Sequence, residues 1–333
     1  MPMNVSIKEI ARRLKISPST VSRALQNHPR IGLRTRERVQ ELAQQLNYVP
    51  SATARNLRSG KTFMLGVVLP EIQENFFSKA INGIEEVAFA RGYTVALYQS
   101  HDQYEREKQV LDVLSRQVVD GVILSVAKES HQFDHIQKLL QHQIPLVLFD
   151  RIPPSIDTHQ VSCNMEMGAY EATGLLVKKG FKRIALLNGP ASLVASQERY
   201  EGYVRALTEA GLSPEPALVE SVDLSTEATR RIMEQWLALP QPPDSVLTFN
   251  DYVALDAMGV CRAKGLRLNT DISFVSFANL PMNAYLEHPP LASVEQHPYR
   301  MGYTAAELIL NAIAQPQASF EKVILQPELM VLS

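Results

Sequence analysis

The sequence predicts a small all-α domain at the N-terminus, followed by a much larger α/β domain built as two similar lobes. Three observations predict this organisation: a strongly basic first segment, three short helical patterns within it, and alternating apolar strands and amphipathic helices from Phe63 onward. With 333 residues, of which 45% are apolar, the chain can bury cores for two or three domains.

The charge of the chain is divided between these two parts. Residues 1–61 hold twelve Lys and Arg against three acidic residues, a net charge of +9. Residues 62–333 hold 21 basic and 32 acidic residues, a net charge of −11. This division favours a polyanionic partner for the N-terminal domain alone, although charge by itself also fits a solvated basic surface.

The first helix is predicted to begin after Ser6. Ser6 and Glu9 form a capping box, in which the hydroxyl accepts from an amide of the first turn and the carboxylate reaches back to the cap. Four apolar residues then share one face of the helix: Ile7, Ile10, Ala11 and Leu14.

The second helix is predicted to begin after Ser17, with Pro18 at its first position. Val21 and Leu25 point inward. The outer face is then expected to carry three hydroxyls and one guanidinium: Ser19, Thr20, Ser22 and Arg23. Such a face suits a DNA major groove, because hydroxyls bond phosphates or base edges and Arg binds guanine through two donors. The alternative is an ordinary capped surface helix.

A third helix over residues 35–46 completes a three-helix core of the helix-turn-helix kind. The next segment, residues 48–60, is too short and polar to form a stable helix alone, although Ser51 can cap it and Gly60 can end it. Because this segment is basic and carries one exposed apolar residue, Leu57, it is typical of an element ordered in a minor groove.

The remainder of the chain alternates between strands and helices. Strands are predicted at 64–69, 93–98, 121–125 and 145–149, with helices at 77–91, 105–116 and 133–141. The pattern repeats from Glu166, with strands near 183–187, 217–220, 245–249 and 273–277. This alternation predicts parallel sheets covered on both faces, and two similar halves predict a cleft at the carboxyl ends of the strands.

The cysteines and the lengths of the apolar runs indicate the cellular compartment of the protein. Cys163 and Cys261 belong to no CxxC or Cys/His spacing, so they are interpreted as buried free thiols. The N-terminus lacks an apolar run of signal-peptide length, and no stretch approaches the roughly 20 apolar residues that span a bilayer. A cytoplasmic protein is expected.

Two sets of segments carry a resemblance to a known family. The LacI/GalR repressors have a DNA-binding headpiece and hinge that resemble IKEIARRLKISPSTVSRALQNHPRI, TRERV and LNYVPSATARNLRSG. The ligand-binding core of that family, which looks like a periplasmic sugar-binding protein, resembles GVVLPEIQENFFSKAINGIEEVAFARGY, DGVIL, GFKRIALLNGP, SQERYEGYVRAL, FNDYVALDAMG and PPLASVEQHPYRMG. The resemblance covers nearly the whole chain. It implies a lambda-repressor-like helix-turn-helix domain and a periplasmic-binding-protein-like domain of two lobes.

The resemblance also implies domain limits, since the chain in that family crosses between lobes three times. They are a helix-turn-helix domain at 1–49, a hinge helix or linker at 50–61, a first lobe at 62–161 and 292–322, and a second lobe at 162–291 and 323–333.

The resemblance assigns DNA contacts to the headpiece. After Pro18, Ser19 and Arg23 are implied to read bases, and Leu57 is implied to pair with its dimer mate at the centre of a palindrome. The complete implied set is Ser6, Ser19, Thr20, Ser22, Arg23, Arg30, Ala54, Leu57 and Arg58.

Six residues at strand ends are expected to contact a small ligand: Phe76, Phe77, Asp150, Arg199, Asn250 and Asp251. The aromatic pair suits an apolar ring or the C–H face of a sugar. Arg199, Asn250 and Asp251 occupy family positions that contact the effector, and Arg with Asp supplies the donor and acceptor that polyols or acids require. Taken singly, each residue fits a core or rim position about as well.

The sequence departs from the family at one such position. The family usually has a Gly-Phe-Asp type motif after a strand, where this chain has Ser276-Phe277-Ala278-Asn279. Ala278 cannot accept a hydroxyl hydrogen bond, which disfavours a neutral hexose held by carboxylates on both sides. The expected effector is therefore a sugar, sugar acid or sugar phosphate, with Arg199 unopposed and Asn279 as a substitute acceptor; no cofactor is expected.

Other classes fit less well. No GxGxxG, GxxxxGK[ST], GxSxG or HExxH motif indicates an enzyme. His131 and His135 are spaced for metal binding on a predicted helix, but their amphipathic surroundings favour solvation. A transport-type binding protein would need an export signal, and a general nucleoid protein would not need a two-lobed body.

The expected function is sequence-specific repression of carbohydrate-metabolism genes. Ligand-dependent closure of the cleft would decide whether two copies of residues 51–58 pack as helices in the minor groove, with a coupling on the order of 1–3 kcal/mol. A homodimer on a palindromic operator is favoured over a tetramer, since no leucine heptad follows the last strand.

Overall fold

The computed structural model describes residues 6–46, 48, 61–116 and 119–332. The chain divides into two compact units, Met1–Thr62 and Phe63–Ser333, which we call the headpiece and the core domain. Each unit has its own apolar core.

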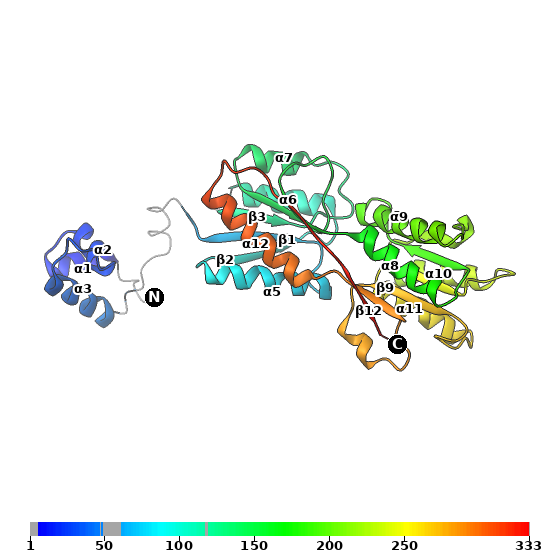
Figure 1. Ribbon diagram of the computed structural model, residues 1–333. Helices are drawn as coiled ribbons and strands as arrows, with labels where there is room; N and C mark the ends of the chain where they lie inside the picture. Colours follow the sequence, from blue (N-terminus) through cyan, green and yellow to red (C-terminus); the bar gives the residue numbers. More distant parts are fainter. Residues whose placement is uncertain (1–5, 47, 49–60, 117–118, 333) are drawn as a thin grey trace. The chain divides into compact units, whose positions relative to one another are not determined.

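Within its described residues, the headpiece has three helices around a small apolar core (Figure 1). They are α1 (Ile7–Leu14), α2 (Pro18–Leu25) and α3 (Leu33–Gln45). The side chains of Ser6 and Ser17 cap α1 and α2 as predicted, by accepting from the amides of Glu9 and Thr20. Helix α3 begins two residues earlier than predicted, after Gly32, which adopts an extended conformation and provides no side-chain cap.

The first lobe of the core domain holds a parallel sheet in the order β11-β5-β4-β3-β1-β2. Its strands are β1 (Met64–Leu69), β2 (Thr94–Gln99), β3 (Gly121–Leu124), β4 (Leu146–Phe149), β5 (His159–Cys163) and β11 (Lys322–Leu325). Its helices are α5 (Asn75–Ala90), α6 (Tyr104–Arg116), α7 (Asp134–Gln141) and α12 (Pro298–Ala314).

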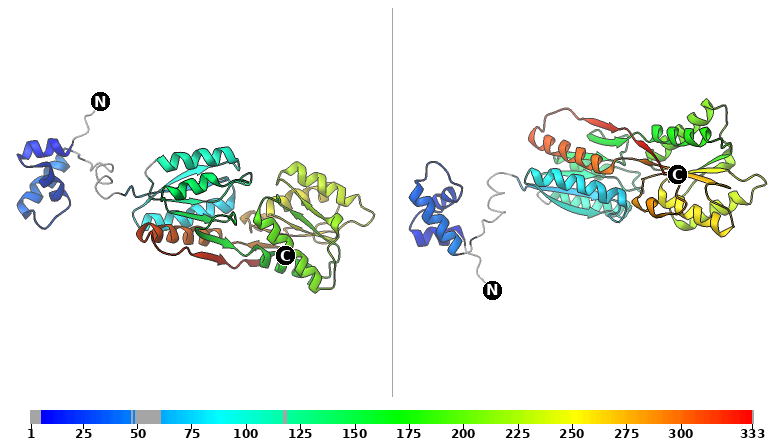
Figure 2. Two further views of the ribbon diagram at one scale, coloured as in Figure 1. Left: turned by 90° about the horizontal axis from the view of Figure 1, so that it is seen from above. Right: turned by 60° about the horizontal axis from the view of Figure 1, so that its bottom comes forward.

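Helices cover both faces of this sheet (Figure 2). Leu65, Val67 and Leu69 of β1 pack in one core with α5 and α12, whereas Val68 packs in another with α6 and α7. This alternation follows from the period of two residues in a strand. The sheet is therefore buried on both sides, as its continuous apolar strands predict.

The second lobe repeats this architecture with the sheet order β12-β10-β9-β8-β6-β7, in which β12 alone runs antiparallel to its neighbour. Its strands are β6 (Ile184–Asn188), β7 (Val219–Ser221), β8 (Ser245–Thr248), β9 (Ser273–Phe277), β10 (Ala292–Glu295) and β12 (Glu328–Val331). Its helices are α8 (Met165–Lys178), α9 (Val194–Glu209), α10 (Thr226–Leu237) and α11 (Asp251–Ala263), with 3-10 turns η1 (Pro216–Leu218) and η2 (Pro281–Tyr285).

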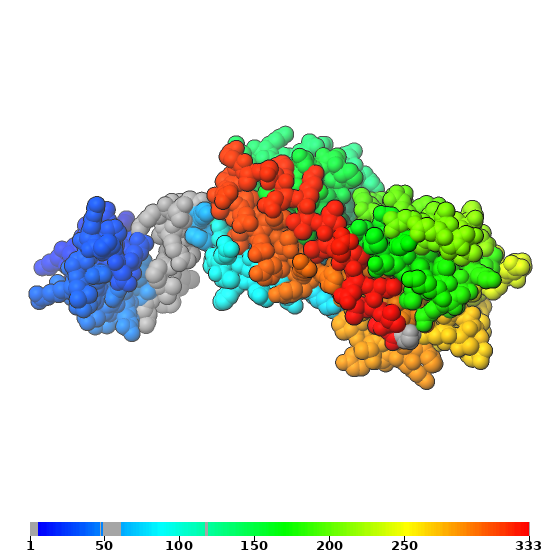
Figure 3. Space-filling model, viewed as in Figure 1, coloured from blue at the N-terminus to red at the C-terminus, as the bar shows by residue number. Residues whose placement is uncertain are grey.

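The chain crosses between the lobes after β5, after β10 and after β11, and the last crossing lies on the molecular surface (Figure 3). These crossings correct the predicted limits at 162, 292 and 323. Residues 162 and 323 lie inside strands, and residue 292 is the first residue of a strand. All residues of a strand belong to the lobe whose sheet the strand pairs with, so a lobe boundary cannot fall at these positions. Thus β10 pairs with β9 of the second lobe, and β11 pairs with β5 of the first through Leu325.

Two other details differ from the sequence expectations. The strand predicted at 217–220 begins only at Val219, because the 3-10 turn η1 precedes it. His131 precedes α7, so it does not share that helix with His135, and His135 is buried rather than solvated. The Nε2 atom of His135 lies 2.7 Å from Oε1 of the buried Glu107.

Cys163 and Cys261 are buried free thiols, as predicted. Burial raises the pKa of each thiol to about 12. No helix within the described residues is both long and apolar enough to span a membrane.

Candidate ligand cavity and nucleic-acid interface

The outer face of α2 presents Ser19 and Arg23 to solvent, while Thr20 is half-buried. The hydroxyls of Ser19 and Thr20 each lie 2.8 Å from the hydroxyl of Ser17, which also caps the helix. The N-terminus of α2 therefore carries a cluster of three hydroxyls, and Arg23 lies one turn further along. Hydroxyls and a guanidinium together can bond both phosphates and base edges.

Ser22 does not lie on this outer face, contrary to the prediction. It is 7% exposed and follows Val21 at the edge of the surface that α2 buries. The buried surface is wide because α2 packs against both α1 and α3, so it includes a position that the spacing of Val21 and Leu25 leaves outside.

Ser6 caps α1 through a 3.3 Å bond from the amide of Glu9. The carboxylate of Glu9, expected to reach back to the cap, instead lies 2.7 Å from Arg12 and 2.9 Å from Arg13. Hydrogen bonds from these guanidinium groups lower the pKa of Glu9. Arg30 is exposed in the turn before α3. Three predicted DNA-binding residues lie outside the described part of the chain: Ala54, Leu57 and Arg58.

A cavity of about 340 Å³ lies between the two lobes of the core domain. This volume is within the range of small-molecule sites. The predicted ligand residues that line it are Phe76, Phe77, Asp150, Arg199 and Asn250. The first three belong to the first lobe and the other two belong to the second, so a ligand here would contact both lobes.

Arg199 is the most deeply buried charged side chain of this cavity. It is 3% exposed, and its guanidinium carbon lies 4.2 Å from the ring centres of both Phe249 and Phe277. Its Nη1 donates to the carbonyl of Ala195 at 3.1 Å, whereas its Nε has no hydrogen-bond partner among the described residues. Burial lowers the pKa of Arg199 to about 10, partly offset by the charge of Asp150.

Asp150 and Arg151 follow β4 directly. Asp150 adopts a left-handed backbone conformation, with φ 61°. Burial raises the pKa of Asp150, although the positive charges of Arg151 and Arg199 oppose this effect. Arg151 forms an ion pair with Asp102 and lies 5.7 Å from the ring centre of Phe77. Arg199 is therefore electrostatically opposed by Asp150, which corrects the expectation that it stands alone.

Asn250 caps helix α11, and its side-chain oxygen accepts from the amide of Val253 at 3.0 Å. Since the oxygen serves the helix, the amide NH2 group is the part of this side chain left for a ligand. A ligand acceptor rather than a donor therefore suits Asn250.

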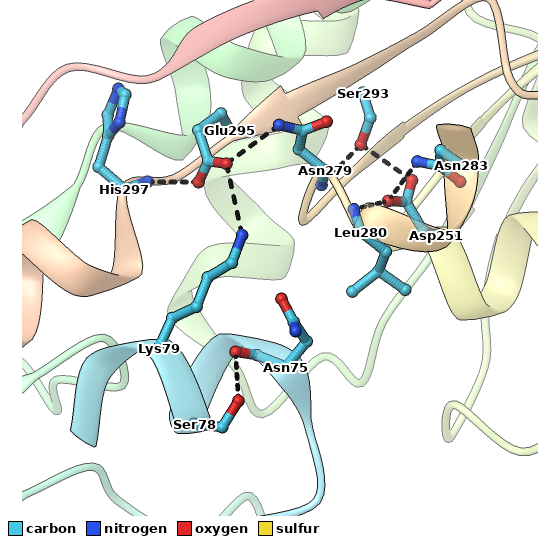
Figure 4. Close-up of polar contacts among 10 residues, drawn as sticks. All are labelled: Asn75, Ser78, Lys79, Asp251, Asn279, Leu280, Asn283, Ser293, Glu295 and His297. Atoms are coloured by element: carbon cyan, nitrogen blue, oxygen red, sulfur yellow. Dashed lines mark hydrogen bonds and ion pairs between the residues drawn. The ribbon is translucent and has the colours of Figure 1, made fainter. Parts of the chain in front are cut away.

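Asp251 does not line the cavity, contrary to the prediction. Its carboxylate is fully buried and accepts from the amide of Leu280 at 2.6 Å and from Asn283 Nδ2 at 2.9 Å (Figure 4). It also accepts from the hydroxyls of Ser276 and of Ser293, the latter at 2.8 Å. Asp251 thus holds the loop after β9 in place and has a structural role beside the cavity.

The loop that Asp251 holds contains the departure from the family motif. Ala278 lines the cavity and has a φ of 91°, a conformation that favours glycine. Asn279 does not replace the missing acceptor, because its side chain donates to Glu295 Oε2 at 3.1 Å and does not line the cavity (Figure 4). The same Glu295 oxygen lies 3.9 Å from Nζ of Lys79 in the first lobe.

Sequence reasoning missed several cavity residues, including Glu74, Arg151 and Phe249. Phe249 directly follows β8, and Arg151 lies two residues after β4. Both positions are at the carboxyl ends of strands, where the cleft is predicted, so both residues could have been predicted from the sequence. Glu74 also lies in the turn after β1, but its residue type gives no signal, because a surface Glu before a helix is common. Within the described residues, no group of three His, Cys, Asp or Glu side chains could hold a metal ion.

Two protein-family models match the chain. The family described as "Bacterial regulatory proteins, lacI family" matches residues 6–51. The family described as "Periplasmic binding proteins and sugar binding domain of LacI family" matches residues 62–331. Together they account for both units of the fold.

Curated relatives match over almost the full length. The HTH-type transcriptional repressor CytR of Escherichia coli (strain K12) is 30% identical over 326 residues, which cover 98% of this chain and 95% of the relative. The HTH-type transcriptional repressor PurR of Aliivibrio salmonicida (strain LFI1238) is 30% identical over 309 residues, 92% of each chain.

Solved structures show the same fold. The transcriptional regulator CelR in complex with cellobiose is 26% identical and superposes with a TM-score of 0.74, covering 98% of both chains. The lac repressor dimer bound to operator and the anti-inducer ONPF is 25% identical with a TM-score of 0.85, covering 98% of this chain and 97% of that one. This chain therefore belongs to the LacI family and is a transcriptional repressor with a helix-turn-helix domain and a periplasmic-binding-protein-like domain, not an enzyme.

Proposed function

We propose that this repressor binds a palindromic operator as a homodimer, and that a small sugar or sugar derivative in the core domain controls its affinity for the operator. The observation that carries the proposal is the cavity lined by residues of both lobes. A ligand that contacts both lobes stabilises one relative orientation of them over others, which is the requirement for a ligand-driven switch.

The composition of the cavity supports a polar ligand with an apolar face. Phe76 and Phe77 supply aromatic surface, while Asp150, Arg199 and Asn250 supply acceptors and donors from opposite lobes. Structures of relatives include a CelR–cellobiose complex and a putative ribose operon repressor, which support a sugar effector and a role in carbohydrate metabolism.

The headpiece supports operator recognition through α2. Exposed Ser19 and Arg23 are the side chains we propose to read base edges, with Thr20 and Arg30 near the phosphates. We propose further that residues 51–58 order in the minor groove, with Leu57 between base steps. The lac repressor dimer bound to operator supports both the dimer and the operator as binding partner.

DNA recognition is tested with a duplex enriched by the full-length protein from a random library. Arg23→Ala is expected to weaken binding to this duplex by about 5- to 150-fold, since a paired Arg–guanine contact contributes about 1–3 kcal/mol. Fluorescence anisotropy measures the affinity. Arg230→Ala, which removes an exposed Arg from α10 of the core domain, is the control and should bind as the parent does. Equal affinity of the two variants would remove Arg23 from the recognition surface.

Ligand control is tested by adding ribose or cellobiose, among other sugars, to the same complex. An effector is expected to change operator affinity by roughly 5- to 150-fold, the usual range of allosteric coupling. If every sugar tested leaves both operator affinity and the thermal midpoint of the protein unchanged, the proposed switch is wrong.

A further inference from the structure

We propose that Glu74 is a ligand-binding carboxylate that, together with Asp150, selects neutral or cationic polyhydroxy ligands and excludes anionic ones. Both carboxylates would accept hydrogen bonds from hydroxyl or amino groups of the ligand. The inference rests on the proposed function, since it names the chemical class of ligand for the same cavity. It excludes the sugar acids and sugar phosphates that the sequence alone left open.

Glu74 is placed for this role by the turn between β1 and α5. It occupies the N-cap position of α5, two residues before Phe76, and it is one of the residues that line the cavity. Its carboxylate does not cap the helix and, within the described residues, forms no hydrogen bond and no ion pair within 4.0 Å. Glu74 is therefore a half-buried residue of the cavity lining whose carboxylate has unused acceptors.

The positive charge nearest to Glu74 is already engaged. Arg151 forms an ion pair with Asp102, and its Nε lies 3.9 Å from Asp150. The cavity wall from the first lobe therefore contains two acidic residues, Glu74 and Asp150, and one basic residue, Arg151. The charge of Arg151 is neutralised by Asp102. This wall has a surplus of acceptors and of negative charge.

The opposite wall supplies the second observation. Arg199 lines the same cavity, is 3% exposed, and leaves Nε without a hydrogen-bond partner in the described part of the chain. Its position between Phe249 and Phe277 holds the guanidinium in a fixed orientation. One buried donor of this wall thus lacks an acceptor among the described residues.

Charge decides between the ligand classes. A phosphate carries about −1.5 to −2 charges at pH 7, and here it would meet two carboxylates and Arg199, whose charge Asp150 already opposes. A hydroxyl group, in contrast, donates to Glu74 or Asp150 and accepts from Arg199 without adding charge. An amino group adds positive charge beside the carboxylates and is favoured for the same reason.

Burial raises the pKa of Glu74 and the pKa of Asp150. For Glu74, the charge of Arg151 opposes this effect, while Asp102, Asp150 and Glu71 add to it. Ligand hydroxyls or amines that donate to these carboxylates would stabilise their ionised forms.

The test uses ligands that share a skeleton and differ in charge. D-Glucose, D-glucosamine, D-gluconate and glucose 6-phosphate form one set, and ribose with ribose 5-phosphate forms a second. Binding to the full-length protein is measured by calorimetry. Neutral or amino members are expected to bind at least tenfold more tightly than the anionic members of their set.

Variants separate the contribution of Glu74. Glu74→Gln keeps the shape of the side chain and is expected to weaken binding of the neutral or amino ligand at least tenfold. The ratio of its affinities for the neutral sugar and for the sugar phosphate should also become smaller than in the parent. Glu71→Gln is the matched control, since Glu71 lies on the same turn but contacts His101 at 3.1 Å and does not line the cavity. Equal ligand affinities of the two variants would overturn the proposal.

Two other outcomes would also overturn it: an anionic ligand that binds as tightly as its neutral partner, and a failure of every member to bind. Operator affinity, read in the same titrations, separates this inference from the proposed function. A sugar phosphate that binds and changes operator affinity overturns the inference alone. A neutral sugar that binds through Glu74 without changing operator affinity contradicts only the switch.

Discussion

Asp251 is a single buried carboxylate that shapes the wall of the cavity without lining the cavity itself. It accepts hydrogen bonds from Leu280, Asn283, Ser276 and Ser293, and thereby fixes the loop that carries Ala278 into the cavity wall. Its neighbour Asn250 lines the cavity. The sequence motif places both residues near the site, but only the direction of each side chain distinguishes a ligand contact from a support.

Asp251→Ala is expected to destabilise the core domain by about 2–4 kcal/mol, because it leaves several buried donors without an acceptor. Urea denaturation measures the change in free energy of unfolding. Asp157→Ala is the control: Asp157 is exposed and pairs with Lys322 at 3.0 Å, and the loss of such a pair costs at most about 1 kcal/mol. A cost for Asp251→Ala no larger than that of the control would contradict the structural role.

The raised pKa of Glu74 predicts a pH dependence of stability. Because the folded pKa is higher than the unfolded value near 4.5, folding favours the protonated form. The stabilisation that this carboxyl provides is present below pH 4.5 and is lost as the pH rises through the folded pKa. The Gln side chain of Glu74→Gln does not ionise, so the variant does not lose this stabilisation. Its thermal midpoint should therefore rise relative to that of the parent as the pH increases from 4 to 7.

Thermal denaturation of both proteins without ligand across that range checks this prediction. A difference in midpoint that does not vary with pH would show that Glu74 has an ordinary pKa in the folded protein.

At the scale of elements, close helix pairs fix the shape of each lobe. Helices α8 and α9 approach so closely that a Cβ atom on Gly202 would lie 2.0 Å from the carbonyl oxygen of Glu166. Gly202→Ala therefore requires the two backbones to separate and is expected to cost about 1–3 kcal/mol or more. Thermal or urea denaturation measures it.

Gly174 in α8 provides the matched control, because a Cβ atom there would meet nothing within 4 Å. Gly174→Ala is expected to be neutral or to stabilise by up to about 1 kcal/mol through helix propensity. If both substitutions stabilise the protein, the close approach of α8 and α9 is not a constraint on the fold.

Elements that can be predicted from the sequence are those with a strong local period. The capped helices α1 and α2 and the apolar strands β1 and β9 were predicted within a residue or two. Strands β11 and β12 were not, because they are short, largely exposed and defined by distant partners in β5 and β10. These strand pairings decide to which lobe a strand belongs, and they cannot be predicted from the local sequence of the strand.

The same reasoning explains which site residues were found. Aromatic and charged residues at strand ends, such as Phe77 and Asp150, lie in the cavity because parallel strands direct their carboxyl ends to one edge. Ser22 was misplaced because packing against two helices widens the buried face of α2. Glu74 was missed because its place in the cavity lining depends on the shape of the cavity and not on a motif.

For the whole molecule, the division of charge predicts that salt affects DNA binding far more than binding of a neutral ligand. Operator binding through the +9 segment should release counterions and weaken about a thousandfold or more between roughly 50 and 200 mM salt, if about six phosphates are contacted. Binding of a neutral ligand to the core domain should change little over that range. Anisotropy and calorimetry across a salt series measure both, and a flat profile for DNA would contradict the charge argument.

The central claim, that this repressor reads a two-fold symmetric DNA sequence under the control of a cavity ligand, is tested most directly by selection from random duplexes with the full-length protein. Sequencing of the bound DNA should return a palindromic consensus, and the affinity for that consensus should change when a ligand of the core domain is added. Bound DNA that shows no sequence preference over the starting library, with and without ligand, would contradict the account.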